Sequence, residues 1–400
     1  MNDKVLKKFN KLFPWYAGLS GDLLFWVAID TLFLTVVKKF TASQIVSLTS
    51  IPLIICIILQ VPLLTIIGKI GNTKSVRLGA FMLLLSSILL TFGPNYITVV
   101  IGRIIYEIAM TFNNMVNATL KNNLDIQNKE NDYIRLRTNA NTIYAVITMI
   151  ISFIASILFN INNYLPMIGC ITFCFICFIL SFYMVDYSNN DNVKKENNNS
   201  NKKLKYSKII IFMIMSYGLF YPIVNSGQSN GKLFIQQELL KNYSVEKAAL
   251  IIGAILCISR IIRVISNISF NKVHKKFKDK VGFILPVLLS LSLWLMVIGY
   301  MLKFNIVIRI IIMSLGYIII LFIRDPFKVY IQDLALKHSN KSKQQKILAT
   351  LDLSRKIIRT IISLSFTLIL INHPMILVIS ILIVLSLIEI LISLYLYKML

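Results

Sequence analysis

Long apolar blocks are the feature that most constrains the fold of this 400-residue chain. A helix of about 20 apolar residues crosses the hydrocarbon core of a bilayer, and in lipid the backbone polar groups must be satisfied within helices or closed barrels. The blocks predict an all-α integral membrane protein with about twelve transmembrane helices in two pseudo-symmetric six-helix bundles. The predicted spans are 13–37, 44–68, 77–94, 95–120, 138–160, 163–184, 208–232, 246–270, 281–302, 304–324, 347–371 and 374–397.

Composition and charge agree with a membrane class. Hydrophobic residues make up 56% of the chain and charged residues 15%, whereas soluble domains have roughly 45–50% and about 25%. The net charge of +25 comes from Lys and Arg clusters between the apolar blocks. We therefore expect contact with anionic lipid and no nucleic-acid partner.

The basic loops predict the topology. With the N-terminus in the cytoplasm, the inward segments hold 28 Lys and Arg residues and the outward segments hold 6. The positive-inside rule then places both termini in the cytoplasm. A high content of Ile, Asn and Lys further suggests a bacterial cell membrane.

An Asn- and Lys-rich stretch divides the chain near its midpoint. Residues 186–207 contain few apolar side chains and cannot form a core. We expect three parts: an N-terminal six-helix bundle over 1–185, a cytoplasmic linker over 186–207, and a C-terminal six-helix bundle over 208–400.

The two halves share a layout at a nearly fixed offset. Phe40 and Tyr243 begin similar segments before spans two and eight, and Gly79 and Gly282 open spans three and nine, each pair 203 residues apart. Two parallel repeats of this kind are typical of transporters with a binding cavity between them.

The segment between spans two and three resembles a motif of the major facilitator superfamily. Gly71, Lys74 and Gly79 fit the Gly- and Arg/Lys-rich pattern, whereas the usual Asp falls on Gly68 and is absent. Similarity to this family implies twelve helices, a central cytoplasmic loop and secondary transport.

Several charged residues are predicted inside the membrane, where each costs at least ~2.5–3.5 kcal/mol unless it has a partner or faces a cavity. Span one contains Asp22 and Asp30, and span four contains Arg103, Glu107 and Asn114 on one face. Asp30 and Arg103 lie at similar depth and could pair. Gly102–Glu107 is also similar to the span-four arginine motif of proton-coupled exporters, which implies that Asp22, Asp30 or Glu107 exchanges protons.

The second half carries basic stripes instead. They comprise Arg260 and Arg263 in span eight, and Asp352, Arg355 and Arg359 in span eleven. Asp352 can neutralise Arg355 within its helix, which leaves a positive surplus. An acidic first half and a basic second half would suit a zwitterionic solute.

The pattern favours a secondary active transporter of a small solute, with proton-coupled export by alternating access. The alternatives are a non-transporting membrane subunit, the permease part of a multi-subunit pump, and a lipid flippase. We expect a monomer that is not an enzyme, whose partners are a small-molecule substrate, protons and the lipid bilayer. No cofactor or metal site is predicted, and the sequence contains no GxxxxGK[ST] phosphate loop.

The topology can be tested by labelling. A cysteine placed at Asn198 should resist an impermeant thiol reagent added to intact cells and react once the membrane is opened, because the basic linker is predicted to be cytoplasmic. Labelling from outside would reverse the assigned orientation.

Overall fold

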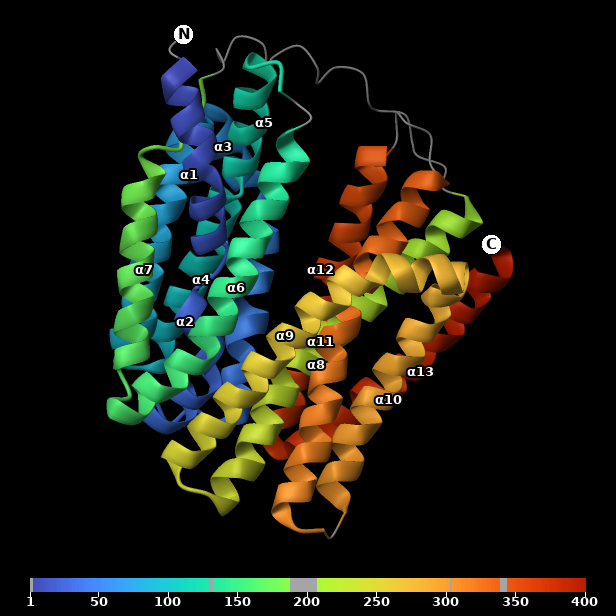
Figure 1. Cartoon of the computed structure of the whole chain (residues 1–400). Coiled ribbons are helices and arrows are strands. Elements are labelled where there is room, and N and C mark those ends of the chain that lie inside the picture. The colour runs from blue at the N-terminus through green and yellow to red at the C-terminus, as the bar shows by residue number, and fades with distance from the viewer. Residues whose placement is uncertain (1–2, 130–131, 188–206, 303, 339–343) are drawn as a thin grey trace. The chain divides into compact units, whose positions relative to one another are not determined.

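The computed structural model describes residues 3–129, 132–187, 207–302, 304–338 and 344–400, and these residues form helices joined by short turns and loops, without a strand (Figure 1). The chain forms two compact units. Unit 1 comprises Met1–Asp30 and Ile51–Lys203, and unit 2 comprises Thr31–Ser50 and Leu204–Leu400. The contacts of residues 31–50 therefore group this short segment with the second half of the chain.

Unit 1 is built from the helices of the first half. Their bounds are α1 (Asp3–Leu19), α2 (Leu24–Leu32), α3 (Ala42–Phe92), α4 (Tyr96–Asn113), α5 (Met115–Ile126), α6 (Asp132–Ile161) and α7 (Leu165–Ser181). The last residues of α2 and the first of α3 belong to unit 2. Helix α1 packs against α6, α7 and α5, so its aromatic face forms the centre of one core cluster. That cluster contains Phe9, Phe13, Tyr16, Val76, Val116, Leu120, Leu124, Leu136, Ala140 and Met184.

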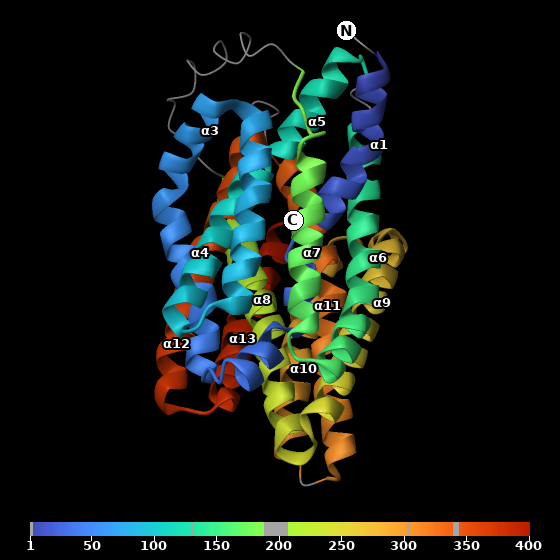
Figure 2. The ribbon, with the colours of Figure 1, turned by 90° about the vertical axis from the view of Figure 1, so that its left-hand side faces the viewer.

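Helix α3 contains two membrane-length helices joined at Gly71. This glycine has φ 79° and ψ 167°, a conformation that L side chains rarely adopt. Figure 2 shows α3 doubling back through this bend. The glycine of the predicted loop motif thus has a backbone role in the turn.

Unit 2 contains the helices of the second half together with a π-helical turn at Phe33–Val37. Their bounds are α8 (Lys208–Asn242), α9 (Val245–Phe277), α10 (Val281–Met301), α11 (Ile306–Lys337), α12 (Gln344–Asn372) and α13 (Met375–Met399). Helix α8 is the centre of the unit, because it packs against α11, α12 and α13 and also touches α9 and α10.

Within the described residues, nine helical stretches are long and apolar enough to cross a membrane. Three further segments complete the twelve that were predicted. They are the second arm of α3, the 17-residue α7, and α12, whose apolar part contains Arg355, Lys356 and Arg359. The predicted all-α membrane fold is therefore confirmed.

The helices differ from three of the predicted spans. Spans one and four each contain two helices, α1 and α2 in the first and α4 and α5 in the second, within stretches long enough to cross a membrane. The span predicted over 304–324 continues as helix to Lys337, because Pro326 is accommodated inside α11 instead of ending it.

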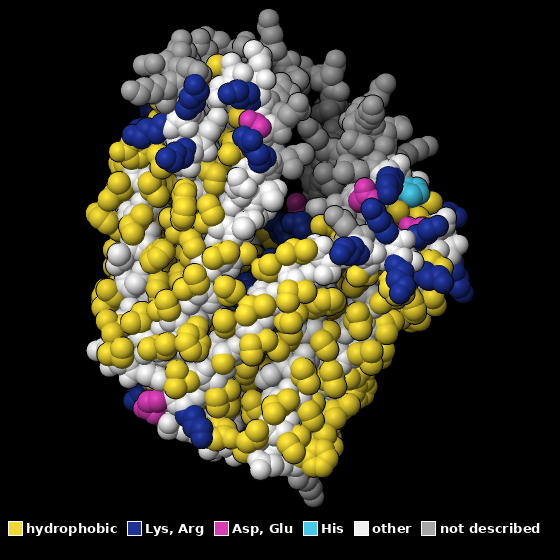
Figure 3. Space-filling view, viewed as in Figure 1, with side chains coloured by type: hydrophobic (Ala, Val, Ile, Leu, Met, Phe, Trp, Pro, Cys, Tyr) yellow, Lys and Arg dark blue, Asp and Glu magenta, His cyan; other side chains and the backbone are white. Residues whose placement is uncertain are grey.

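The surface shows how the helices meet lipid. Large apolar side chains are exposed along most helices, including Ile58, Val61, Phe175, Ile268 and Leu391. Figure 3 shows hydrophobic side chains over most of the visible face, with Lys and Arg mostly in separate patches near its margins. Extended exposed apolar patches mark contact with a membrane or a protein partner.

Most of the predicted linker, residues 188–206, lies outside the described residues. Its first residues are anchored in unit 1. The Asp186 carboxylate accepts hydrogen bonds from Asn72 Nδ2 at 2.7 Å and Asn122 Nδ2 at 2.8 Å. The backbone N–H of Tyr187 donates to Asn123 Oδ1 at 2.9 Å.

Gly79 allows the second arm of α3 to approach α4 closely. A Cβ there would lie 2.7 Å from the backbone nitrogen of Asn113. We expect Gly79→Ala to lower the free energy of unfolding by about 1–3 kcal/mol, the usual cost of overpacking. Gly68→Ala is the control, because a Cβ at Gly68 meets no atom within 4 Å. Thermal unfolding in detergent measures both, and equal stabilities would contradict the steric argument.

Candidate functional site

The first transmembrane helix is broken at Ser20–Leu23. Helix α1 ends at Leu19 and α2 begins at Leu24, and Asp22 lies between them. A break within a membrane segment exposes backbone polar groups, which are tolerated only where protein or water satisfies them. Broken helices of this kind form ion and substrate sites in many transporters.

Asp22 is partly buried and has two donors. Tyr106 of α4 donates its hydroxyl to Asp22 Oδ1 at 2.6 Å, and the backbone N–H of Leu23 donates to the same oxygen at 2.8 Å. Tyr106 is 8% exposed, so this contact lies inside unit 1.

A second break, between α4 and α5, faces the first. Asn113 is buried at this point and donates from Nδ2 to the backbone oxygen and to Oγ of Ser20, both at 3.0 Å. Its Oδ1 accepts a hydrogen bond from the Tyr16 hydroxyl. Asn113 therefore satisfies polar groups of α1 at the residue where that helix ends.

Asn114, the predicted site residue, is exposed and has no side-chain cap contact at the start of α5. Its role in a substrate or proton pathway stays a prediction. The neighbouring Asn113, which the sequence interpretation did not select, makes the polar contact with the first span.

Arg103 and Glu107 extend the polar group along α4. Arg103 Nη2 lies 3.7 Å from Glu107 Oε1, and its guanidinium lies 4.5 Å from the centre of the Tyr106 ring. Tyr106, which the sequence interpretation did not select, therefore joins Arg103 to Asp22. Asp30 lies about two turns further along the chain in α2, and its contact with Arg103 stays a prediction.

The predicted residues of the second half have different surroundings. In α9, Arg263 forms a bidentate pair with Asp325 of α11, at 2.6 Å from Nε and 3.1 Å from Nη2. Arg260 of α9 is 7% exposed. The Asp325 carboxylate thus reduces the net positive charge that was predicted for the second half of the chain.

In α12, Arg355 Nη2 lies 3.4 Å from Asp352 Oδ1. Arg359 lies one turn further along the same helix and is partly buried. Arg355 also lies 5.3 Å from the ring of Tyr221 in α8, another residue that the sequence interpretation did not select.

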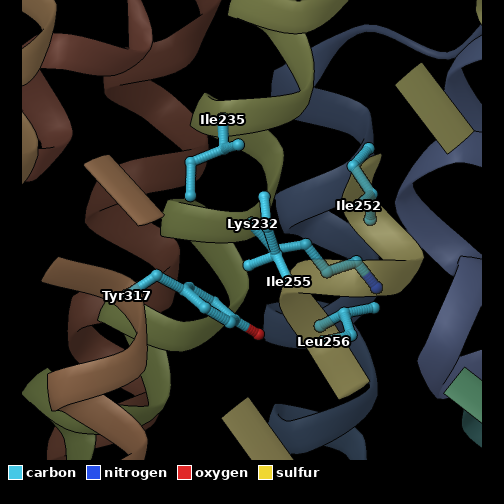
Figure 4. A pocket seen from close by; sticks show the side chains of 6 residues that line it. All are labelled: Lys232, Ile235, Ile252, Ile255, Leu256 and Tyr317. Atoms are coloured by element: carbon cyan, nitrogen blue, oxygen red, sulfur yellow. The ribbon is translucent and has the colours of Figure 1, made fainter. Parts of the chain in front are cut away.

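Cavities within unit 2 are small or open. One is lined by Lys232, Ile235, Ile252, Ile255, Leu256 and Tyr317 (Figure 4). Its volume of about 10 Å³ is at the lower limit for a single water molecule. Among the described residues, no group of three or more His, Cys, Asp or Glu side chains gathers as a metal site.

Comparison with known proteins identifies the fold. No family model and no curated protein matches the sequence. Among solved structures, a bacterial homologue of the iron transporter ferroportin in an inward-facing state has a TM-score of 0.73 and 12% identity, over 99% of this chain and 100% of that one.

Two further solved structures share the architecture. A variant of the nucleoside transporter NupG has a TM-score of 0.72 and 13% identity, over 97% of this chain and 99% of that one. A bacterial metal transporter has a TM-score of 0.69 and 11% identity, over 97% and 98%. The chain therefore has the fold of these multi-pass membrane transporters.

The two asparagines provide a direct test of the site. We expect Asn113→Ala to lower the free energy of unfolding by about 2 kcal/mol, at roughly 0.6 kcal/mol for each of three hydrogen bonds in a membrane protein. The exposed Asn114→Ala is the matched control and should be near neutral. Thermal unfolding in detergent separates them, and a larger loss for Asn114→Ala would refute the assignment.

Proposed function

We propose that this chain is a secondary transporter of the major facilitator type, which moves a small solute by alternating access and couples this movement to protons. The observation that carries the proposal is the break in the first transmembrane helix, with the partly buried Asp22 in it. The fold, shared with solved membrane transporters over nearly the whole chain, supports the same reading.

Asp22 is the proposed proton carrier. Its hydroxyl partner, Tyr106, is both a donor and an acceptor. When Asp22 is ionised, Tyr106 donates to it at 2.6 Å. When Asp22 is protonated, the carboxyl can donate to the tyrosine oxygen, so the contact survives the change of charge. Glu107, which pairs with Arg103, is the second candidate.

The similarity of Gly102–Glu107 to the exporter motif favours export. The proposed organisation remains a bundle over 1–185, a cytoplasmic linker over 186–207 and a bundle over 208–400, in a bacterial cell membrane with both termini inside. Reconstitution of the chain alone separates solute transport from a non-transporting subunit and from a pump permease, since a pump permease needs a separate ATPase.

The decisive measurement uses proteoliposomes with a pH-sensitive dye inside. Uridine, Fe²⁺, ethidium and the zwitterionic carboxylate glutamate are the probes, and one of them should drive proton movement through the unmodified chain. Asp22→Asn should abolish this proton movement while downhill exchange of the solute continues. Asp333→Asn, a carboxylate 50% exposed near the end of α11, is the control and should behave as the unmodified chain.

Two outcomes would count against the proposal. If Asp22→Asn concentrates solute against its gradient as well as the unmodified chain does, Asp22 is not the proton carrier. If none of the probes crosses the membrane through the unmodified chain, a non-transporting subunit becomes the better reading.

A further inference from the structure

Two arginines lie close to a single buried tyrosine in unit 2. Tyr221 of α8 is 3% exposed. The Arg324 guanidinium of α11 lies 5.9 Å from the centre of its ring, and the Arg355 guanidinium of α12 lies 5.3 Å from it. Three helices that are distant in sequence thus bring two positive charges to one aromatic ring.

These arginines are incompletely neutralised. Arg324 donates from Nη1 to the neutral Gln228 at 2.8 Å, and its buried Nε has no hydrogen-bond acceptor among the described residues. Arg355 has Asp352 at 3.4 Å, whose side chain is 50% exposed. The cluster of Arg324, Arg355 and Asp352 therefore has a net charge of about +1.

A third donor lies beside them. Tyr217 of α8 is fully buried, and its ring centre lies 5.3 Å from that of Tyr221. Its hydroxyl has no hydrogen-bond partner among the described residues. It lies within electrostatic range of Arg355, Asp352 and Arg324. Buried polar groups normally have partners, whereas Arg324 Nε and the Tyr217 hydroxyl are buried donors without an acceptor among the described residues.

Two other arginines of unit 2 show the contrast. Arg263 is held by both oxygens of Asp325. Arg309 lies 2.9 Å from the buried Glu238 and donates to the backbone oxygen of Tyr300 at 3.0 Å. In both places a buried or partly buried carboxylate balances the guanidinium, whereas Arg324 has an amide in that position.

We propose that Arg324, Arg355 and Tyr217 form a binding site for an oxyanion, the carboxylate or phosphate group of a small solute. A guanidinium matches either group through two parallel hydrogen bonds. Charged residues in membrane segments are costly and commonly mark substrate pathways. The inference that an oxyanion binds here does not depend on the proposed function. Its assignment to the transported solute rests on the proposed function.

The test measures binding to the full-length protein in detergent. Sodium phosphate, sodium citrate and sodium glutamate are titrated at constant ionic strength, with sodium chloride as the reference. At least one oxyanion should bind and raise the unfolding temperature above that in chloride. Phosphate and carboxylate probes distinguish the two chemistries.

Variants then locate the site. Arg355→Gln and Arg324→Gln should each weaken binding by on the order of 10- to 100-fold, as expected for a charged hydrogen bond. Lys337→Gln, which removes an exposed charge from the same α11, is the matched control and should bind normally. Arg324→Lys retains the charge and should still weaken binding, because the planar fork is lost.

One variant gives a result that a structural role would not produce. Asp352→Asn removes the carboxylate that competes for Arg355 and should tighten binding by about 2- to 5-fold. Binding no better than chloride for every oxyanion, or unchanged binding in Arg355→Gln, would overturn the site. Normal oxyanion binding without any transport would overturn only the proposed function.

Discussion

Every backbone polar group within the membrane must be satisfied by the protein or by water in a cavity, and the rest of the structure depends on this constraint. Continuous helices meet it by themselves. Where α1 ends at Leu19 and α2 begins at Leu24, side chains must replace the lost helical bonds. Asn113 supplies a donor to the Ser20 backbone oxygen from the break between α4 and α5. The side chain of Asn113, at the end of α4, therefore satisfies a backbone oxygen at the break that holds Asp22.

The same constraint governs the charged residues. Glu238 is 3% exposed and is surrounded by Lys241 at 2.6 Å and Arg309 at 2.9 Å. Glu389 is fully buried and accepts hydrogen bonds from Ser216 at 2.6 Å and Ser393 at 2.8 Å. The first is a buried ion pair that ties α8 to α11, and the second is a carboxyl with hydroxyl partners that ties α13 to α8. Removing one partner of such a group leaves an uncompensated buried charge or polar atom, which is far more destabilising than the contact is stabilising.

The two units use polar groups in different ways. In unit 1 the polar chain runs from Asp22 through Tyr106 to Arg103 and Glu107, so one carboxylate and one guanidinium contact the same tyrosine. In unit 2, two guanidiniums lie 5.9 Å and 5.3 Å from the centre of the Tyr221 ring, and the carboxylate of Asp352 pairs with one of them. A tyrosine can serve in both settings because its hydroxyl donates to an anion and its ring face attracts a cation.

The sequence by itself determined the helical membrane fold, because block length and apolar content follow directly from the thickness of a bilayer and need no knowledge of neighbours. It also identified Asp22, Arg103 and Glu107 as candidate site residues, since a charged residue within an apolar block is evident from the sequence alone. Only the tertiary structure decided which side chains meet. Asn113, and not Asn114, turns towards Ser20. Tyr106 connects Asp22 to Arg103, and Asp325 binds Arg263. These contacts depend on where a helix is interrupted and on which helix packs beside it. Packing between segments distant in the chain sets both features, and the periodicity along a single helix does not encode that packing.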